Sequence, residues 1–173
     1  MILAVDVYYS QNDAVDAGVL FENWADADVV NELIIPVSPI AQYQPGEFYK
    51  RELPCVMTLL EQLEVLPDYI IIDGYVYLDD AHKPGFGKYL YDALQGKVAI
   101  IGVAKKRFKG TPSDTVVFRR ESKRALYVTA VGIEQTEAKY FIMQMHGHYR
   151  LPTMLRRVDQ LSRRKELIVT IKI

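Results

Sequence analysis

Two short, almost entirely apolar runs limit the folds that this chain can adopt. The runs Tyr69 to Ile72 and Val98 to Val103 are typical of strands buried on both faces, as in a parallel sheet covered by helices. Asp73 follows the first run directly, and Lys105 comes two residues after the second. A carboxylate at the end of a buried strand is costly unless it is paired or bound to a cation. The sequence therefore predicts an α/β fold with charged groups at one sheet edge.

Three further strands are expected before the first of these runs. Residues 1–9, 14–24 and 29–37 have strand-like composition, and the polar segments at 11–13 and 25–28 separate them with short turns. Short connections favour an antiparallel meander. Asp6 interrupts the apolar residues of the first strand. We expect it near Asp73, because both carboxylates could then share one cation.

Helical spacing of apolar residues begins after Glu52. The pattern predicts a helix over residues 53–63, with Pro54 in its first turn and Glu52 at its N-terminal end. The remaining elements are expected as a helix from about 86 to 94, paired strands at 115–120 and 125–131, helices at 136–145 and 153–165, and a closing strand at 167–173. The predicted architecture is a mixed sheet of three antiparallel strands plus parallel strands, flanked by helices, in a single domain over residues 1–173.

Charge is divided unevenly along the chain. Residues 1–90 hold 4 Lys or Arg and 15 Asp or Glu, whereas residues 91–173 hold 17 and 7. This division suits a protein that holds phosphates with one half and a metal with the other, although charge complementarity inside the fold explains it equally well. Neither a membrane-spanning run nor a secretory signal is evident. Cys55 is the only cysteine, so we expect a core thiol in a cytoplasmic protein.

Several segments, taken in order, resemble one known family. They are the strand around Asp6, the stretch from Tyr43-Gln44-Pro45-Gly46 to Arg51-Glu52, Asp73-Gly74, Ala81-His82 before Gly85-Phe86-Gly87, Ile101 to Lys105, Tyr127-Val128-Thr129, and Tyr149 to Pro152 with Arg156 and Asp159. Each segment is weak alone, but their number, order and spacing are specific. Together they resemble the endonuclease V family, which has a ribonuclease H-like fold and cuts nucleic acids near inosine, the deaminated form of adenosine.

The resemblance implies roles for individual residues. Asp6, Glu52 and Asp73 would bind Mg²⁺, for which Mn²⁺ could substitute, and Lys105 would assist catalysis. Tyr43 would match the tyrosine of a strand-separating wedge, although the chain lacks the first proline of the usual Pro-Tyr-x-Pro. The further substrate-binding residues would be Gly46, Gly74 and His82.

Each of these residues also has a structural explanation. Asp6 could lie at a strand kink, Asp73 could form a turn, and Glu52 could favour a helix dipole. Lys105 could be a solvated charge. Among the substrate-binding candidates, Tyr43 could pack on the helix, the two glycines could be plain turn residues, and His82 could lie on the surface.

One departure concerns a histidine that the resemblance places after Tyr127-Val128-Thr129. There it would complete the metal environment, but it falls on Val131, Gly132 or Ile133, none of which binds a metal. Glu134 is the hypothetical replacement, because it lies between a predicted strand and a predicted helix, and Glu137 is the next candidate.

The function implied is a metal-dependent endonuclease, a monomer, that hydrolyses DNA or RNA at a phosphodiester 3′ to inosine. The alternative is a nuclease-like protein that binds nucleic acid without cutting, because the histidine is missing. A weaker alternative is a nuclease of the same fold that acts on another substrate, such as a branched or RNA strand.

Overall fold

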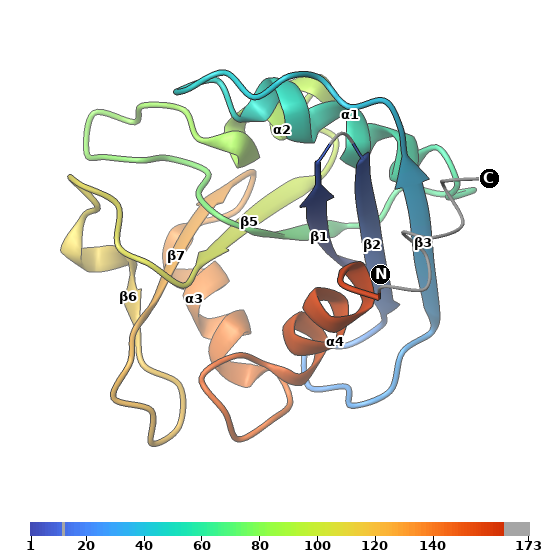
Figure 1. Ribbon diagram of the computed structural model, residues 1–173. Coiled ribbons are helices and arrows are strands. Elements are labelled where there is room, and N and C mark those ends of the chain that lie inside the picture. Colours follow the sequence, from blue (N-terminus) through green and yellow to red (C-terminus); the bar gives the residue numbers. More distant parts are fainter. Residues whose placement is uncertain (12, 165–173) are drawn as a thin grey trace.

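A mixed sheet of seven strands forms the centre of the protein (Figure 1). The computed structural model describes residues 1–11 and 13–164. In this part of the chain the strands are β1 (Ile2–Ser10), β2 (Asp13–Phe21), β3 (Asn31–Val37), β4 (Tyr69–Asp73), β5 (Ala99–Ala104), β6 (Val116–Val117) and β7 (Leu126–Val131). Their spatial order is β3-β2-β1-β4-β5-β7-β6. The first three strands are antiparallel, and β1, β4 and β5 run parallel, as the sequence predicts.

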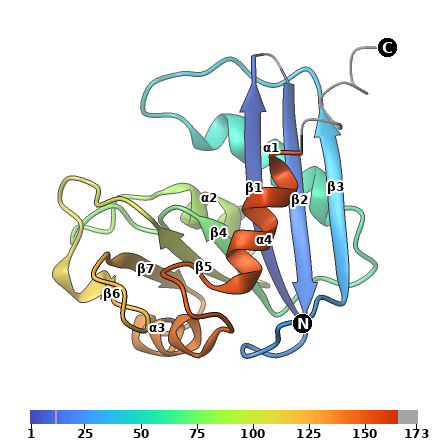
Figure 2. The same ribbon diagram turned by 60° about the horizontal axis from the view of Figure 1, so that its bottom comes forward.

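Helices cover both faces of this sheet (Figure 2). The helices α1 (Tyr49–Leu60) and α2 (Phe86–Ala93) lie on one face, and α3 (Gln135–Gln144) and α4 (Thr153–Ser162) lie on the other. The alternation of strand side chains creates one apolar core on each face. Leu3 and Val5 belong to the α1–α2 core, whereas Ile2 and Ala4 belong to the core beneath α3 and α4.

The parallel centre has the burial that its apolar sequence predicts. Ile70, Ile71 and Ile72 of β4 are 0–2% exposed, and β5 pairs with them in register, Ile70 opposite Ile100. The predicted α/β class and mixed sheet are therefore confirmed. None of the helices in the described residues is long and apolar enough to cross a membrane.

Some predicted boundaries are wrong. Strand β2 ends at Phe21 rather than Trp24, whose ring instead leaves the sheet and stacks on Phe141 with centroids 4.5 Å apart. Strand β6 contains two residues rather than the six expected. Its continuation is lost because the Arg119 side chain turns inward and donates to the main-chain carbonyls of Ile142 and Met145. The predicted strand at 167–173 lies outside the described residues.

Helix α1 also begins earlier than the sequence indicates. It starts at Tyr49, so Glu52 lies in its first turn as expected, but Pro54 lies inside the helix. Proline there removes the hydrogen bond that its amide would give to the carbonyl four residues back. That residue, Lys50, is exposed, so solvent can reach the helix at this point.

Candidate active site

Asp6 and Asp73 lie beside one another where the parallel pairing of β1 and β4 ends. Val5 of β1 pairs with Ile72 of β4, which places the next residue of each strand, Asp6 and Asp73, at the same level of the sheet. The sequence prediction that these two carboxylates meet at a sheet edge agrees with this register.

Lys105 joins this edge from the neighbouring strand β5. Its Nζ lies 2.8 Å from Asp73 Oδ2 and 3.5 Å from Asp159 Oδ1. Burial alone would lower the pKa of Lys105, but the hydrogen bond with Asp73 and the charges of Asp73, Asp159 and Asp6 raise it overall. Lys105 is therefore a stable ammonium group between carboxylates.

Asp159 is a member of this site to which the sequence analysis gave no role. It lies on α4, whose buried residues Met154, Val158 and Leu161 pack against the sheet, and it points to the edge where β4 and β5 end. The same hollow is lined by Asp6, Asp73 and Lys105. Helical spacing could have shown that Asp159 directly follows a core position, but only the packing angle of α4 brings it to Asp73.

Ser162, at the last position of α4, orients Asp6. Its hydroxyl donates a 2.6 Å hydrogen bond to Asp6 Oδ2 and is itself fully buried. Burial raises the pKa of Asp6, the Ser162 hydrogen bond opposes that rise, and the charges of Asp73 and Asp159 add to it. The site thus keeps a carboxylate in a poorly solvated place where a cation would stabilise it.

Glu52 faces the same edge from α1. Its side chain is only 8% exposed, and burial, followed by the charges of Asp16, Asp6 and Asp73, raises its pKa well above the ordinary value. Together with Asp73, it forms part of the wall of a cavity of about 460 Å³ between α1 and α2. The three carboxylates predicted from the sequence, Asp6, Glu52 and Asp73, are therefore neighbours.

That cavity has aromatic walls and glycines at its mouth. Gly46 and Gly74, both predicted to contact substrate, line it and have φ values of 78° and 144°, which favour glycine. Tyr49 and Tyr89 stack with centroids 3.6 Å apart and also line it. A flat aromatic ligand the size of a nucleobase suits such walls, because stacking on aromatic faces is how bases are commonly held.

Gly102 and Thr129 belong to two of the segments that resemble the family, and both support the chain behind the cavity. A Cβ on Gly102 would lie 2.6 Å from the carbonyl oxygen of Gly74, so only glycine lets β5 pass this close to the turn after β4. Thr129 of β7 accepts a 2.8 Å hydrogen bond at Oγ1 from the amide of Val76. Both residues fix the segment that carries Asp73.

Tyr43 and His82 lie outside the carboxylate cluster. Tyr43 is 58% exposed in the segment before α1, and its only aromatic neighbour among the described residues is Phe48, at 6.4 Å edge to face. The ring of His82 stacks on Tyr77 at 4.5 Å, while the next residue, Lys83, lines the cavity. Neither residue lines the cavity, and neither bonds to the carboxylates.

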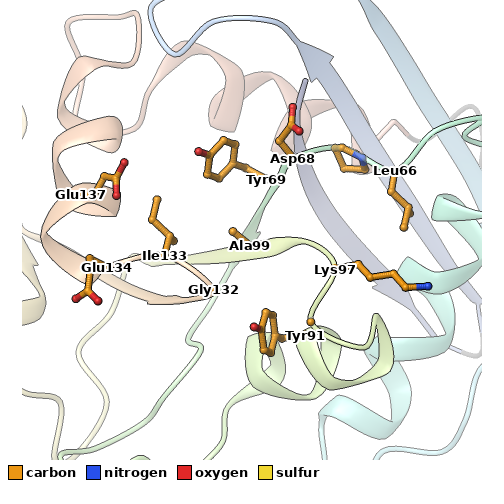
Figure 3. A pocket seen from close by; sticks show the side chains of 12 residues that line it. Leu66, Asp68, Tyr69, Tyr91, Lys97, Ala99, Gly132, Ile133, Glu134 and Glu137 are labelled. Atoms are coloured by element: carbon orange, nitrogen blue, oxygen red, sulfur yellow. The ribbon is translucent and has the colours of Figure 1, made fainter.

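Glu134 lies at the opposite end of the sheet. Strand β7 is antiparallel to β5, with Val131 opposite Ile100, so the chain after β7 continues at the beginning of β5. There Glu134 and Gly132 line a separate cavity of about 930 Å³ with Tyr69 and Lys97 (Figure 3). Glu137 lines the same cavity, so the hypothesis that Glu134 or Glu137 replaces a metal ligand is wrong.

The same geometry places the positions at which the histidine was expected. A histidine at Val131, Gly132 or Ile133 would also lie at the far end of the sheet, away from Asp6 and Asp73. A further carboxylate beside Asp6 and Asp73 comes from α4, as Asp159.

The donor set suits a hard divalent cation. Carboxylate oxygens are the ligands that Mg²⁺ prefers, and Asp6 and Glu52 are buried where uncompensated charge is costly. In residues 1–11 and 13–164, no three carboxylate, histidine or cysteine side chains already converge in coordinating geometry. Lys105 lies between Asp73 and Asp159, so a bound cation would have to draw these carboxylates toward itself.

Comparison with known proteins decides the family. The sequence profile described as Endonuclease V matches residues 1–128. The chain belongs to the endonuclease V family. An endonuclease V of Alkalilimnicola ehrlichii is 30% identical over 170 residues, which cover 87% of this chain and 74% of that protein. Since the family consists of nucleases, the expectation of an enzyme is confirmed.

Solved structures of endonuclease V share the fold. The crystal structure from Streptomyces avermitilis has a TM-score of 0.76 at 26% identity, covering 98% of this chain and 82% of that one. Human endonuclease V has a TM-score of 0.77 at 21% identity, covering 99% and 85%. Endonuclease V of Ciona intestinalis, with a TM-score of 0.75 at 17% identity over 97% and 86%, was solved with a DNA containing an inosine followed by a ribo-adenosine. These likenesses confirm the predicted ribonuclease H-like fold.

Proposed function

We propose that this protein is a metal-dependent endonuclease that recognises inosine in nucleic acid and hydrolyses a phosphodiester on its 3′ side. The observation that carries the proposal is the position of Asp73, which belongs both to the charged edge with Lys105 and Asp159 and to the aromatic cavity beside Glu52. A base held in the cavity would therefore place its backbone next to the carboxylates.

Binding of the base would use the cavity between α1 and α2. The stacked pair Tyr49 and Tyr89 provides aromatic surface, and Gly46 and Gly74 let the main chain approach the edge of the base without a side chain intervening. Tyr43, exposed beyond the cavity, could fill the space that a displaced base leaves in its strand.

Cleavage would use the charged edge. Asp6, Glu52 and Asp73, with Asp159, would hold Mg²⁺ or Mn²⁺, which when bound supplies an activated water and stabilises charge on the phosphorane oxygens. Ser162 keeps Asp6 in a fixed orientation, and the Lys105 ammonium would stabilise negative charge on the non-bridging or leaving oxygen. The lysine is already protonated, because its carboxylate neighbours raise its pKa, so it can act as a cation without first gaining a proton.

The test is cleavage of single-stranded oligonucleotides made of DNA, of RNA, and of DNA with a ribonucleotide 3′ to the inosine, each with and without the inosine. Each would be incubated with Mg²⁺, Mn²⁺ or EDTA, using Asp6→Asn as the inactive variant and Glu64→Gln, an exposed position, as the matched charge control. Metal-dependent cutting 3′ to inosine that Asp6→Asn abolishes is the expected result. Binding without cutting in every metal would overturn it in favour of the nuclease-like binding protein.

The proposal includes a monomer acting in the cytoplasm. The buried state of Cys55 suits a reducing compartment, since the thiol neither forms nor needs a disulfide in the described chain. The elution mass of the purified protein, with and without an inosine oligonucleotide, tests the monomer.

A further inference from the structure

A group of buried polar atoms between the β1–β2 pair and α1 lacks hydrogen-bond partners. Among the described residues, the atoms are both carboxylate oxygens of Asp16, the hydroxyl of Tyr9 and Nε of Arg51. Asp16, on β2 between β1 and the edge strand β3, is 0% exposed. A buried carboxylate with neither a side-chain donor nor a cation is rare, because it loses the hydration that it has in water.

Asp16 faces α1 rather than α4. It lies opposite Val7 of β1, and the alternation of β2 puts Leu20 in the α1 core and Ala17 in the α4 core. Asp6 is opposite Ala17 and bonds Ser162 of α4. The two aspartates thus lie on opposite faces of the same pair of strands.

Glu52 and Tyr9 share the space that Asp16 faces. After burial, the charge of Asp16 is the largest cause of the raised pKa of Glu52. The charges of both carboxylates also raise the pKa of the Cys55 thiol. Arg51 does not neutralise them, because its guanidinium carbon lies 4.0 Å from the centroid of the Tyr9 ring and its Nε is unbonded. Strand alternation puts Asp16 and Tyr9 on the face of the β1–β2 pair that α1 covers, and the buried Glu52 belongs to α1. Two buried carboxylates and a phenolic hydroxyl therefore lie on one side of these strands, where the guanidinium of Arg51 is placed over the Tyr9 ring.

We propose that Asp16 and Glu52 hold a second divalent cation, of the Mg²⁺ or Mn²⁺ class, between β2 and α1, with the Tyr9 hydroxyl as a neutral oxygen ligand. Mg²⁺ is commonly held by only one or two protein carboxylates and completes its octahedron with water. This inner site therefore needs no third acidic ligand. It rests on the proposed function only in sharing Glu52 with the outer site of Asp6 and Asp73.

The test counts bound ions without nucleic acid. The full chain would be stripped of metal and titrated with Mn²⁺, with free Mn²⁺ followed by electron paramagnetic resonance. We expect two Mn²⁺ per wild-type chain, one in Asp16→Asn and one in Asp6→Asn, and two in Glu64→Gln. Tyr9→Phe keeps both carboxylates and should bind the inner ion about tenfold more weakly.

Two further outcomes separate the inner metal site from the proposed function. Wild-type stoichiometry and affinity in both Asp16→Asn and Tyr9→Phe would overturn the inner site and leave Asp16 and Glu52 as a buried pair that retains a proton. Circular dichroism of each variant confirms folding, and Tyr9→Phe carries the test if Asp16→Asn does not fold. Failure to cut inosine substrates while two ions bind would contradict the proposed function but not the inner site.

Discussion

Ser162 donates a 2.6 Å hydrogen bond to Asp6 and so ties the last described helix to the first strand of the sheet. The bond favours the ionised form of Asp6 against the effect of burial. In Ser162→Ala the pKa of Asp6 should rise further, so the acid limb of the pH–rate profile should move to higher pH and cleavage near neutrality should fall by about 10- to 100-fold. Ser162→Thr retains the hydroxyl and is the control. Superimposable profiles for alanine and wild type would contradict this role.

Lys105 should oppose metal binding while assisting cleavage. Its ammonium group already neutralises Asp73 and Asp159, so Lys105→Met should bind Mn²⁺ more tightly than wild type yet cut at least about 100-fold more slowly. Lys106→Met, at the exposed next residue, should leave both properties near wild type. Mn²⁺ titration and single-turnover cleavage measure the two effects separately. A parallel fall in affinity and rate would show that Lys105 only maintains the structure.

The stability of the metal-free protein should decline as pH rises. Folding raises the pKa of Asp16 above 3.8 through burial and the charge of Asp6, so the stabilising contribution is complete below 3.8 and is lost as pH rises through the folded value. A tenfold difference in proton affinity between the folded and unfolded chain corresponds to about 1.4 kcal/mol of stability. In EDTA, Asp16→Asn should therefore unfold at higher denaturant concentration than wild type at pH 8, with a smaller difference at pH 4. A stability difference between Asp16→Asn and wild type that does not grow from pH 4 to pH 8 would disprove the raised pKa of Asp16.

The fold was predictable because its signals are local and repeated. The isoleucine run of β4 and the glycine-containing run of β5 identify buried parallel strands whatever surrounds them, and Asp73 follows at the strand end. Asp159, Ser162 and Asp16 could not be assigned in this way. The roles of Asp159 and Ser162 depend on where α4 crosses the sheet, and Asp16 resembles an outward-facing polar residue until α1 is known to cover that face. Glu134 was misplaced because its position depends on the direction of β7.

Arg119 should contribute strongly to stability. Its buried guanidinium donates to the carbonyls of Ile142 at 3.1 Å, Met145 at 2.6 Å and Tyr149 at 2.6 Å, and burial lowers its pKa to about 10, with a smaller effect from Arg120. Arg119→Met would leave these carbonyls unbonded and should cost about 3 kcal/mol, or about 6–12 °C in Tm. Arg120→Met, at the exposed neighbour, should change Tm by less than about 2 °C. Thermal unfolding followed by circular dichroism measures both.

Substitutions at Tyr43 test whether its ring separates the strands of a duplex or only packs against its neighbours. Its ring is 58% exposed and meets Phe48 only at its edge, so Tyr43→Ala should lower Tm by no more than about 2 °C. A ring that separates strands matters only where there are strands to separate. Cleavage of inosine in duplex DNA should therefore fall about tenfold or more, since one base–aromatic contact is worth about 1–3 kcal/mol, while cleavage of a single strand changes less. Tyr43→Phe keeps the ring and should behave as wild type on both substrates. Equal losses on duplex and single strand would instead show that Tyr43 contributes general affinity, and a large fall in Tm would assign it to packing beside α1.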